Sequence, residues 1–301
     1  MNSDATQPPA QPTGIQGLWV WQEQWVADEA EQDRLIEFCR QYGFNMLMVQ
    51  IHLDGGGGPS PALKYPDQLA ELIRKAAEHG IAVEALEGGP EQALKENHDH
   101  TLAILDAIIA FDSTLPEDAR LTGVHYDIEP YVLPAWQDLD DRRQIMLGLA
   151  QFFAKARERI DEHAPHLTLA ADIPFWYDNL GEDGEVEFAG QTKNIHQHIQ
   201  DICDYIGIMS YRRDATGPNS VAEHVETEMA YAEQIGKWVL PALETVELTD
   251  TPQITFFGES PESFWQTHNA VREHFADRPG FGGMLTHSYR SLRELLEGDQ
   301  D

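Results

Sequence analysis

The chain has 301 residues, 42% of them hydrophobic, and its 52 acidic and 20 basic residues give it a net charge of −32. This length fits one large α/β barrel or two ordinary domains, and no apolar run is long enough to span a membrane. Such a negative field repels nucleic acid and anionic lipid surfaces, so we expect neither as a partner.

Residues 1–13 are polar and rich in proline and glutamine, which predicts a disordered N-terminal tail. The tail lacks the basic and apolar regions of a secretory signal, so the sequence indicates a cytoplasmic protein. Cys39 and Cys203 are the two cysteines, and each falls in a predicted helix just before a strand. They are expected to be buried, reduced thiols and not a disulfide. No pattern indicates an oligomeric state.

Short apolar runs and amphipathic segments alternate along the rest of the chain. The runs predict eight strands, at residues 17–21, 45–52, 81–87, 123–129, 167–175, 205–211, 238–244 and 281–287. The segments predict helices at residues 28–42, 65–79, 91–111, 135–163, 194–203, 221–235 and 261–276, with a last helix at 292–296. Glycines 55–58 are expected to form a pliable loop, and residues 176–193 a long loop over a pocket.

Strict alternation of strand and helix predicts a single α/β domain, a (β/α)8 TIM barrel, over residues 14–301. A doubly wound sheet is the alternative architecture. It is less favoured, because no glycine-rich dinucleotide fingerprint follows the first strand and the strand count closes at eight.

Residues 123–131 form the stretch of the sequence that most clearly indicates chemistry. If the strand continues through it, His125, Asp127 and Glu129 project to one face and apolar side chains to the other. Burying three ionisable groups without partners is costly. The pattern therefore predicts that this strand ends in a polar pocket.

The carboxyl ends of the strands build the active site of such a barrel. Here they carry carboxylates, other polar groups and aromatic rings, which together suit a pocket for sugars. The candidate site residues are Trp19, Trp21, Gln50, His52, Glu84, His125, Asp127, Glu129, Asp172, Trp176, Met209, Tyr211, Arg212, Glu244 and His287.

Three motifs carry a resemblance to a known family. Gly123-Val124-His125-Tyr126-Asp127-Ile128-Glu129 is similar to the D-G-φ-D-φ-D-x-E pattern on the fourth strand of family-18 glycoside hydrolases, the chitinase-like barrels. Met209-Ser210-Tyr211 resembles that family's Met-x-Tyr, and residues 282–287 resemble its Gly-Gly-x-Met-x-Trp. The chain departs from the patterns at four positions: Thr122, His125, Arg212 and His287.

The resemblance implies a glycoside hydrolase that acts on a glycan containing N-acetylhexosamine. Glu129 would be the general acid/base, Asp127 would support attack by the substrate's own 2-acetamido group, and Tyr211 would bind that group. The other candidate residues would bind the carbohydrate substrate. His125 would tune the charge of Asp127 in place of the family's aspartate, and no metal or other cofactor is expected.

Three alternatives stay open at this point. Glu129 and Glu244 can instead be the acid/base and nucleophile of a retaining glycosidase of the two-carboxylate type. A carbohydrate-binding barrel without activity, a chitinase-like lectin, is less favoured because both Asp127 and Glu129 are present. A divalent-metal site would have to combine His52, His125 and His287 with Glu84, Asp127 and Asp172, and no His-x-His or His-Glu-x-x-His spacing favours it.

The acidic residues are spread over predicted helix surfaces, in a chain with only 6 lysines. Such a surface suits a halophilic protein, because salt screens the self-repulsion. We therefore expect the free energy of unfolding to rise between low and molar KCl. Urea unfolding across a KCl series measures it, and equal stability at both ends would contradict the prediction.

Overall fold

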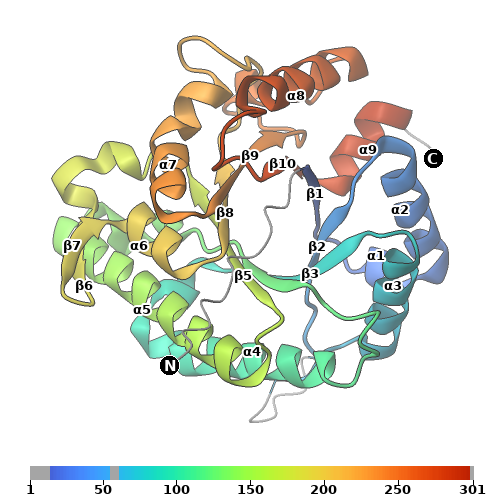
Figure 1. Ribbon diagram of the computed structural model, residues 1–301, viewed down its shortest axis with the longest axis horizontal. Coiled ribbons are helices and arrows are strands. Elements are labelled where there is room, and N and C mark those ends of the chain that lie inside the picture. The colour runs from blue at the N-terminus through green and yellow to red at the C-terminus, as the bar shows by residue number, and fades with distance from the viewer. Residues whose placement is uncertain (1–13, 55–60, 299–301) are drawn as a thin grey trace, which may run out of the picture.

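The computed structural model describes residues 14–54 and 61–298, and within them eight parallel strands close into a barrel surrounded by helices (Figure 1). The order around the barrel is β1-β10-β9-β8-β5-β4-β3-β2. The strands are β1 (Ile15–Val20), β2 (Met46–Gln50), β3 (Ala82–Glu87), β4 (Gly123–Tyr126), β5 (Thr168–Pro174), β8 (Tyr205–Met209), β9 (Trp238–Glu244) and β10 (Gly283–His287). The predicted single (β/α)8 barrel is therefore confirmed. The predicted tail and the glycine loop 55–58 lie outside the described residues.

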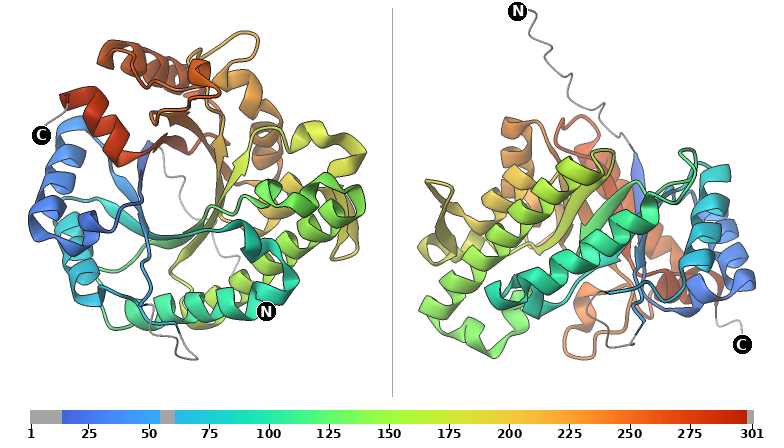
Figure 2. Two further views of the ribbon diagram at one scale, coloured as in Figure 1. Left: turned by 180° about the vertical axis from the view of Figure 1, so that it is seen from behind. Right: turned by 90° about the horizontal axis from the view of Figure 1, so that it is seen from below.

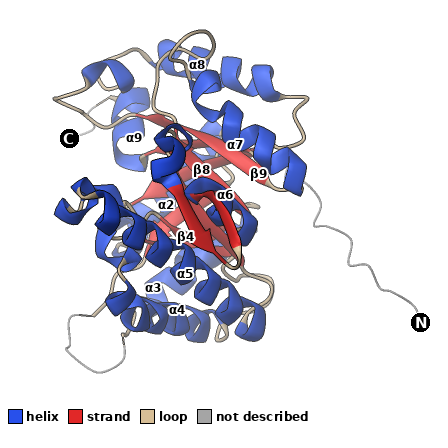
Figure 3. Cartoon of the chain, turned by 90° about the vertical axis from the view of Figure 1, so that its left-hand side faces the viewer, coloured by secondary structure: helices blue, strands red, loops and turns tan. Residues whose placement is uncertain are grey.

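Helices form the outer ring, as the views from behind and from the side show (Figures 2 and 3). They are α1 (Gln24–Ala27), α2 (Glu29–Tyr42), α3 (Pro66–Glu78), α4 (His98–Asp112), α5 (Leu139–His163), α6 (Ile195–Ile202), α7 (Val221–Ile235), α8 (Pro261–Phe275) and α9 (Tyr289–Glu297). Among the described residues, no helix has the length and apolar character needed to cross a membrane.

Side-chain caps explain where several of these helices begin. Asp28 caps α2 by accepting the backbone N–H groups of Ala30 and Glu31, and Asp138 caps α5 in the same way. Gly43 ends α2 in the left-handed conformation that glycine adopts without strain. Cys39 and Cys203 are both buried and free, as expected.

The structure differs from the sequence prediction in two places that matter for the site. β4 ends at Tyr126, so Asp127 and Glu129 lie in the loop after the strand and not within it. The segment 176–193 is not a plain loop, because it contains the 3-10 helix η5 (Asp178–Gly184) and an antiparallel hairpin of β6 (Glu185–Phe188) and β7 (Gln191–Asn194).

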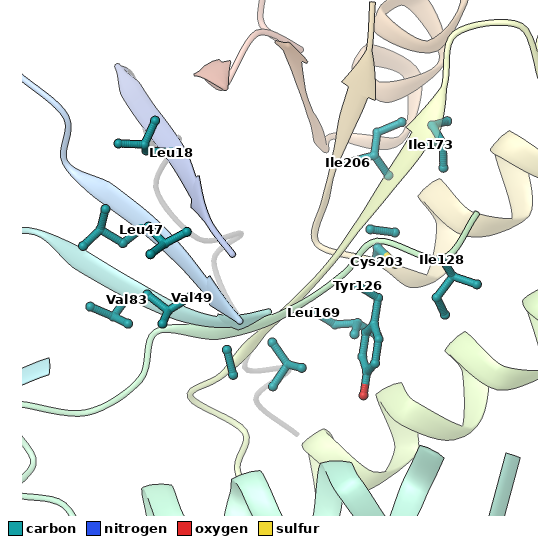
Figure 4. Packing of buried hydrophobic residues seen from close by; sticks show 14 of the residues in the cluster. Leu18, Leu47, Val49, Val83, Tyr126, Ile128, Leu169, Ile173, Cys203 and Ile206 are labelled. Atoms are coloured by element: carbon teal, nitrogen blue, oxygen red, sulfur yellow. The ribbon is translucent and has the colours of Figure 1, made fainter. Parts of the chain in front are cut away.

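One buried layer lies on each side of the barrel wall that the strands form. The outer layer packs strand side chains, such as Leu47, Tyr126 and Ile206, against the helices (Figure 4). Tyr126, for example, contacts Phe152 and Phe153 of α5. The inner layer fills the barrel with a smaller apolar cluster, which consists of Ile15, Trp19, Met46, Met48, Leu86, Ala170, Tyr205, Leu240, Ala242 and Leu285. The barrel is thus a packed core, and ligands are limited to its ends.

Two inward-facing glycines make room for charged side chains inside this core. A Cβ at Gly207 would lie 2.1 Å from Oδ1 of Asp172, and one at Gly123 would lie 2.7 Å from Oε1 of Glu84. Both distances are too short for non-bonded atoms. The glycines therefore let two carboxylates occupy the barrel interior.

Candidate active site

The loop after β4 carries the two acidic residues of the central motif. The backbone N–H of Asp127 donates to the carbonyl of Glu87 at 2.8 Å, which extends the β3–β4 pairing by one residue. Glu129 directly precedes the 3-10 helix η3 (Pro130–Val132) and is half-buried. The same short loop thus holds both carboxyl groups at the carboxyl end of the barrel.

The two carboxyl groups differ in their surroundings. Oδ1 of Asp127 is fully buried and has no hydrogen-bond partner among the described residues. Burial, reinforced by the negative charges of Asp172 and Glu129, raises the pKa of Asp127 well above its ordinary value, although His125 opposes the shift. Asp127 therefore holds a proton more readily than an exposed aspartate does. The hydroxyl of Tyr131 donates a short hydrogen bond to Oε2 of Glu129.

Aromatic rings form a wall beside these acids. The ring centroids of Tyr131 and Trp176 are 5.1 Å apart, and Trp136 stacks on Tyr177 at 6.2 Å. Burial, together with the charges of Glu129 and Asp127, raises the pKa of Tyr177. Its hydroxyl is buried, protonated and unpartnered within the described part of the chain.

Tyr131 and Tyr177 were missing from the sequence-based candidate residues. Tyr131 stands two residues after Glu129 at the end of the same motif, and that spacing is the signal that points to it. Tyr177 carried no such signal, because its segment was expected to be an irregular loop.

A buried charged network fills the barrel beneath Asp127. Nε2 of His125 lies 2.8 Å from Oδ2 of Asp172, an ion pair that departs from ideal hydrogen-bond alignment, and its Nδ1 lies 3.2 Å from Oε2 of Glu84. Trp19 donates its indole N–H to Oδ2 of Asp172 at 3.0 Å. Tyr205 donates to Oε2 of Glu84. The imidazole thus lies between two carboxylates supplied by neighbouring strands.

This network sets the protonation state of His125. Burial on its own lowers the pKa of the ring, but the charge of Asp172 and the hydrogen bonds of Asp172 and Glu84 outweigh it and raise the pKa to about 10. His125 is therefore an imidazolium at neutral pH. It balances part of the negative charge below Asp127.

The network corrects four of the expected substrate contacts. His125, Glu84, Trp19 and Asp172 are 0%, 1%, 1% and 3% exposed, so their side chains lie inside the closed barrel. Glu84 pairs in register with Gly123, the first residue of β4, and therefore lies far below the strand ends. These side chains support the site from beneath and do not line a sugar-binding surface.

A second polar chain crosses the other side of the barrel end. Trp21 donates its indole N–H to Nε2 of His287 at 2.8 Å, and Nδ1 of His287 lies 3.0 Å from both carboxylate oxygens of Glu244. Because the indole can only donate, Nε2 must accept. His287 is therefore the neutral tautomer that donates from Nδ1 to Glu244.

Glu244 is the most fully bonded acid of the site. Its Oε1 also accepts the backbone N–H groups of Thr245 and Val246, both at 2.7 Å, and the residue is 3% exposed. Tyr211 lies beside it: burial, followed by the charges of Glu244 and Asp127, raises the pKa of the phenol well above its ordinary value. The phenol of Tyr211 thus stays protonated and lies near both Glu244 and Asp127.

The remaining candidates occupy different places. Gln50 and Met209 end β2 and β8 and are half-buried. Arg212 follows Tyr211, and its guanidinium lies 4.9 Å from the ring centroid of Phe175. Burial lowers the pKa of His52, and the charges that act on it are those of Glu23 and Lys64, so His52 is separate from the His125 network.

A metal centre finds no support in this arrangement. Within residues 14–54 and 61–298, no three His, Cys, Asp or Glu side chains are grouped to hold a metal ion. His125 is engaged by two carboxylates as a cation, and His287 uses both ring nitrogens in hydrogen bonds.

The fold is similar to several solved structures of carbohydrate-active barrels. A GH18 chitinase from Pseudoalteromonas aurantia has a TM-score of 0.56 at 15% identity, covering 92% of this chain and 95% of the chitinase. An endo-1,4-beta-mannanase from Eisenia fetida has a TM-score of 0.60 at 14% identity, covering 94% of this chain and 86% of the mannanase. A GH113 beta-1,4-mannanase has a TM-score of 0.52 at 12% identity, covering 97% of this chain and 90% of that enzyme. No family model matches the chain, and no curated protein matches it in sequence. The resemblance seen in the motifs thus extends to the fold.

The raised pKa of His125 makes stability depend on pH. The ordinary pKa is 6.5 and the folded value about 10, so the stabilisation is complete below pH 6.5 and is lost as the pH rises to 10. In the parent protein we expect the free energy of unfolding to fall by about 1.4 kcal/mol per pH unit between pH 8 and 10. His125→Gln should remove this fall, because it removes the group that loses its proton. Urea unfolding across that range measures the slope.

His268→Gln is the matched control. His268 is also fully buried, but burial lowers its pKa to about 4, so it is neutral throughout this range. Its replacement should leave the slope unchanged. Equal slopes for the parent protein and His125→Gln would show that His125 is not charged.

Proposed function

We propose that the protein hydrolyses glycosidic bonds in a glycan that contains N-acetylhexosamine, with Glu129 as general acid/base and Asp127 assisting the substrate. The observation that carries this proposal is the contrast between two carboxyl groups on one loop. Glu129 is half-buried and bonded by Tyr131, while Asp127 has a buried oxygen without a partner. Neighbouring carboxyl groups in unlike environments can take different roles in one reaction.

In this mechanism the acetamido oxygen of the substrate attacks the anomeric carbon while the bond to the leaving oxygen breaks. Glu129 gives its proton to the leaving oxygen and then takes one from the water that opens the cyclic intermediate, so configuration is retained. Asp127 accepts the acetamido N–H, and Tyr211 donates its hydroxyl to the acetamido oxygen. In this proposal the free protein holds a proton on Asp127, whose pKa is raised, and this proton passes to Glu129 when the substrate N–H takes its place.

The aromatic wall supports a sugar as the ligand. Tyr131 and Trp176 are half-buried, and their ring centroids are 5.1 Å apart. Tyr131 bonds to Glu129, so the apolar C–H face of a pyranose can rest on a ring beside this acid. The fold likeness to a chitinase and to mannanases agrees with this choice of ligand. The presence of both acids favours an enzyme over a lectin.

Glu244 as a nucleophile is the competing proposal. It lies close enough to Tyr211 to act on the same phenol as Glu129 and Asp127 do. However, its carboxylate already accepts two backbone N–H groups and the N–H of His287, and each of these bonds stabilises the charge that a nucleophile must share with carbon. We therefore assign Glu244 to holding His287 in place.

The general-acid role predicts how Glu129→Gln behaves. On an N-acetylhexosamine oligosaccharide kcat should fall by about 10²–10⁴-fold, the usual contribution of a general acid. On a p-nitrophenyl glycoside the fall should be smaller, because that leaving group departs without a proton. Both are measured in molar KCl, since we propose that this acidic chain works in concentrated salt.

Glu162→Gln is the control, because Glu162 is exposed on α5, away from the site. Asp127→Asn should abolish turnover of 2-acetamido substrates. Hydrolysis by Glu129→Gln equal to that of the parent protein, or equal turnover of glycosides with and without the acetamido group, would overturn the proposal.

The two mechanisms differ in their response to azide. If Glu244 only positions His287, azide will not restore activity to Glu244→Gly, and no inverted glycosyl azide will form. Thin-layer chromatography or mass spectrometry of the products checks this. Rescue by azide with formation of the glycosyl azide would establish Glu244 as the nucleophile.

A further inference from the structure

Arg212 lies at the rim of the proposed sugar site. It directly follows Tyr211, whose phenol lies near Glu244 and Asp127. Its guanidinium lies over the ring of Phe175, at 4.9 Å from the centroid. Phe175 directly precedes Trp176, which contacts Tyr131 beside Glu129. Arg212 is thus adjacent in sequence to Tyr211 of the site, and its ring partner Phe175 is adjacent in sequence to Trp176 of the aromatic wall.

The guanidinium is held firmly, but by neutral groups. Nε donates to Oδ1 of Asn219 at 2.9 Å, and Nη1 donates to the carbonyl of Tyr211 at 2.7 Å. Nε2 of His224 lies 2.9 Å from the same oxygen of Asn219. These contacts occupy two of the five N–H groups of Arg212 and fix the plane of its guanidinium group. The remaining N–H groups have no partner among the described residues.

Arg212 has no carboxylate partner among the described residues, in a chain with 52 acidic and 20 basic residues. Glu223 accepts the backbone N–H of Asn219 instead. The next residue, Arg213, forms an ion pair with Glu259. Burial lowers the pKa of Arg212, and no neighbouring anion offsets this cost. A partly buried cation in a strongly acidic protein thus lacks a counter-charge.

The missing counter-charge identifies a class of ligand. A guanidinium with a fixed plane binds the two oxygens of a carboxylate through parallel N–H bonds. A neutral glycan would leave Arg212 without a counter-charge. The rest of this acidic surface would repel an acidic glycan, so Arg212 is the place where the acidic group would bind. We infer that the rim at Arg212 binds the carboxylate of an acidic sugar, so that the glycan proposed as substrate contains a sugar acid next to the N-acetylhexosamine. This inference rests on the proposed function.

The test measures binding in the Glu129→Gln background, so it does not require turnover. One probe is an oligosaccharide in which N-acetylglucosamine alternates with glucuronic acid; the other is the same oligosaccharide with its carboxylates reduced to alcohols. Calorimetric titration of both at one KCl concentration should give at least about tenfold tighter binding of the acidic form, the scale of one charge-assisted contact.

Arg212→Gln should remove this preference, and Arg212→Lys should keep part of it, because lysine retains the charge but lacks the fork. Arg213→Gln is the matched control and should keep all of it. A neutral oligosaccharide that carries added sulfate is the third probe. If it binds as tightly as the acidic probe, the site does not select a carboxylate, and the inference is overturned.

Equal binding of the two probes, binding of neither probe, or equal loss of preference in the Arg212 and Arg213 variants would also overturn it. The proposed function fails by a different measurement, hydrolysis of 2-acetamido substrates by the protein with Glu129 intact. The two failures are therefore distinguishable.

Discussion

The ion pair between His125 and Asp172 inside the barrel is the constraint on which the site depends. Replacing a buried ion pair by apolar groups is often neutral for stability, but removing one partner leaves an uncompensated charge. Trp19 on β1, Glu84 on β3 and Tyr205 on β8 complete the set of partners. Each partner must stand at the right height in its strand. The network therefore links side chains of five strands across the barrel interior, in addition to the backbone hydrogen bonds that pair neighbouring strands.

The same network prepares the chemistry above it. Burial, together with the negative charge of Asp172 beneath it, raises the pKa of Asp127 and so makes it hold a proton more readily. His125 limits that effect, because its positive charge opposes the shift. In the proposed reaction this proton becomes the one that Glu129 gives to the leaving group. The charges packed inside the barrel thus act on the pKa of Asp127 in the loop above them.

Short apolar runs that alternate with amphipathic segments are enough to predict the eight strands and the barrel, because both patterns depend on residues near in sequence. It could not predict the depth of each side chain, because depth follows from the stagger between strands in the closed barrel. Glu84 is the clearest case: the sequence assigns it to the substrate, yet it pairs beside Gly123 and bonds to Thr168, Tyr205 and His125. The position of Tyr177 was equally hidden, since it depends on how η5 folds back over Trp136.

The departures from the chitinase-like motifs become consistent once their partners are known. His125 stands where the family has an aspartate, and here it neutralises carboxylates from β3 and β5. His287 replaces a tryptophan, and it connects Trp21 to Glu244. The positive charge of His125 is thereby committed to the interior. Arg212 is the cation that we propose meets a charge on the substrate, and it stands where the chitinase-like motif usually has an aspartate.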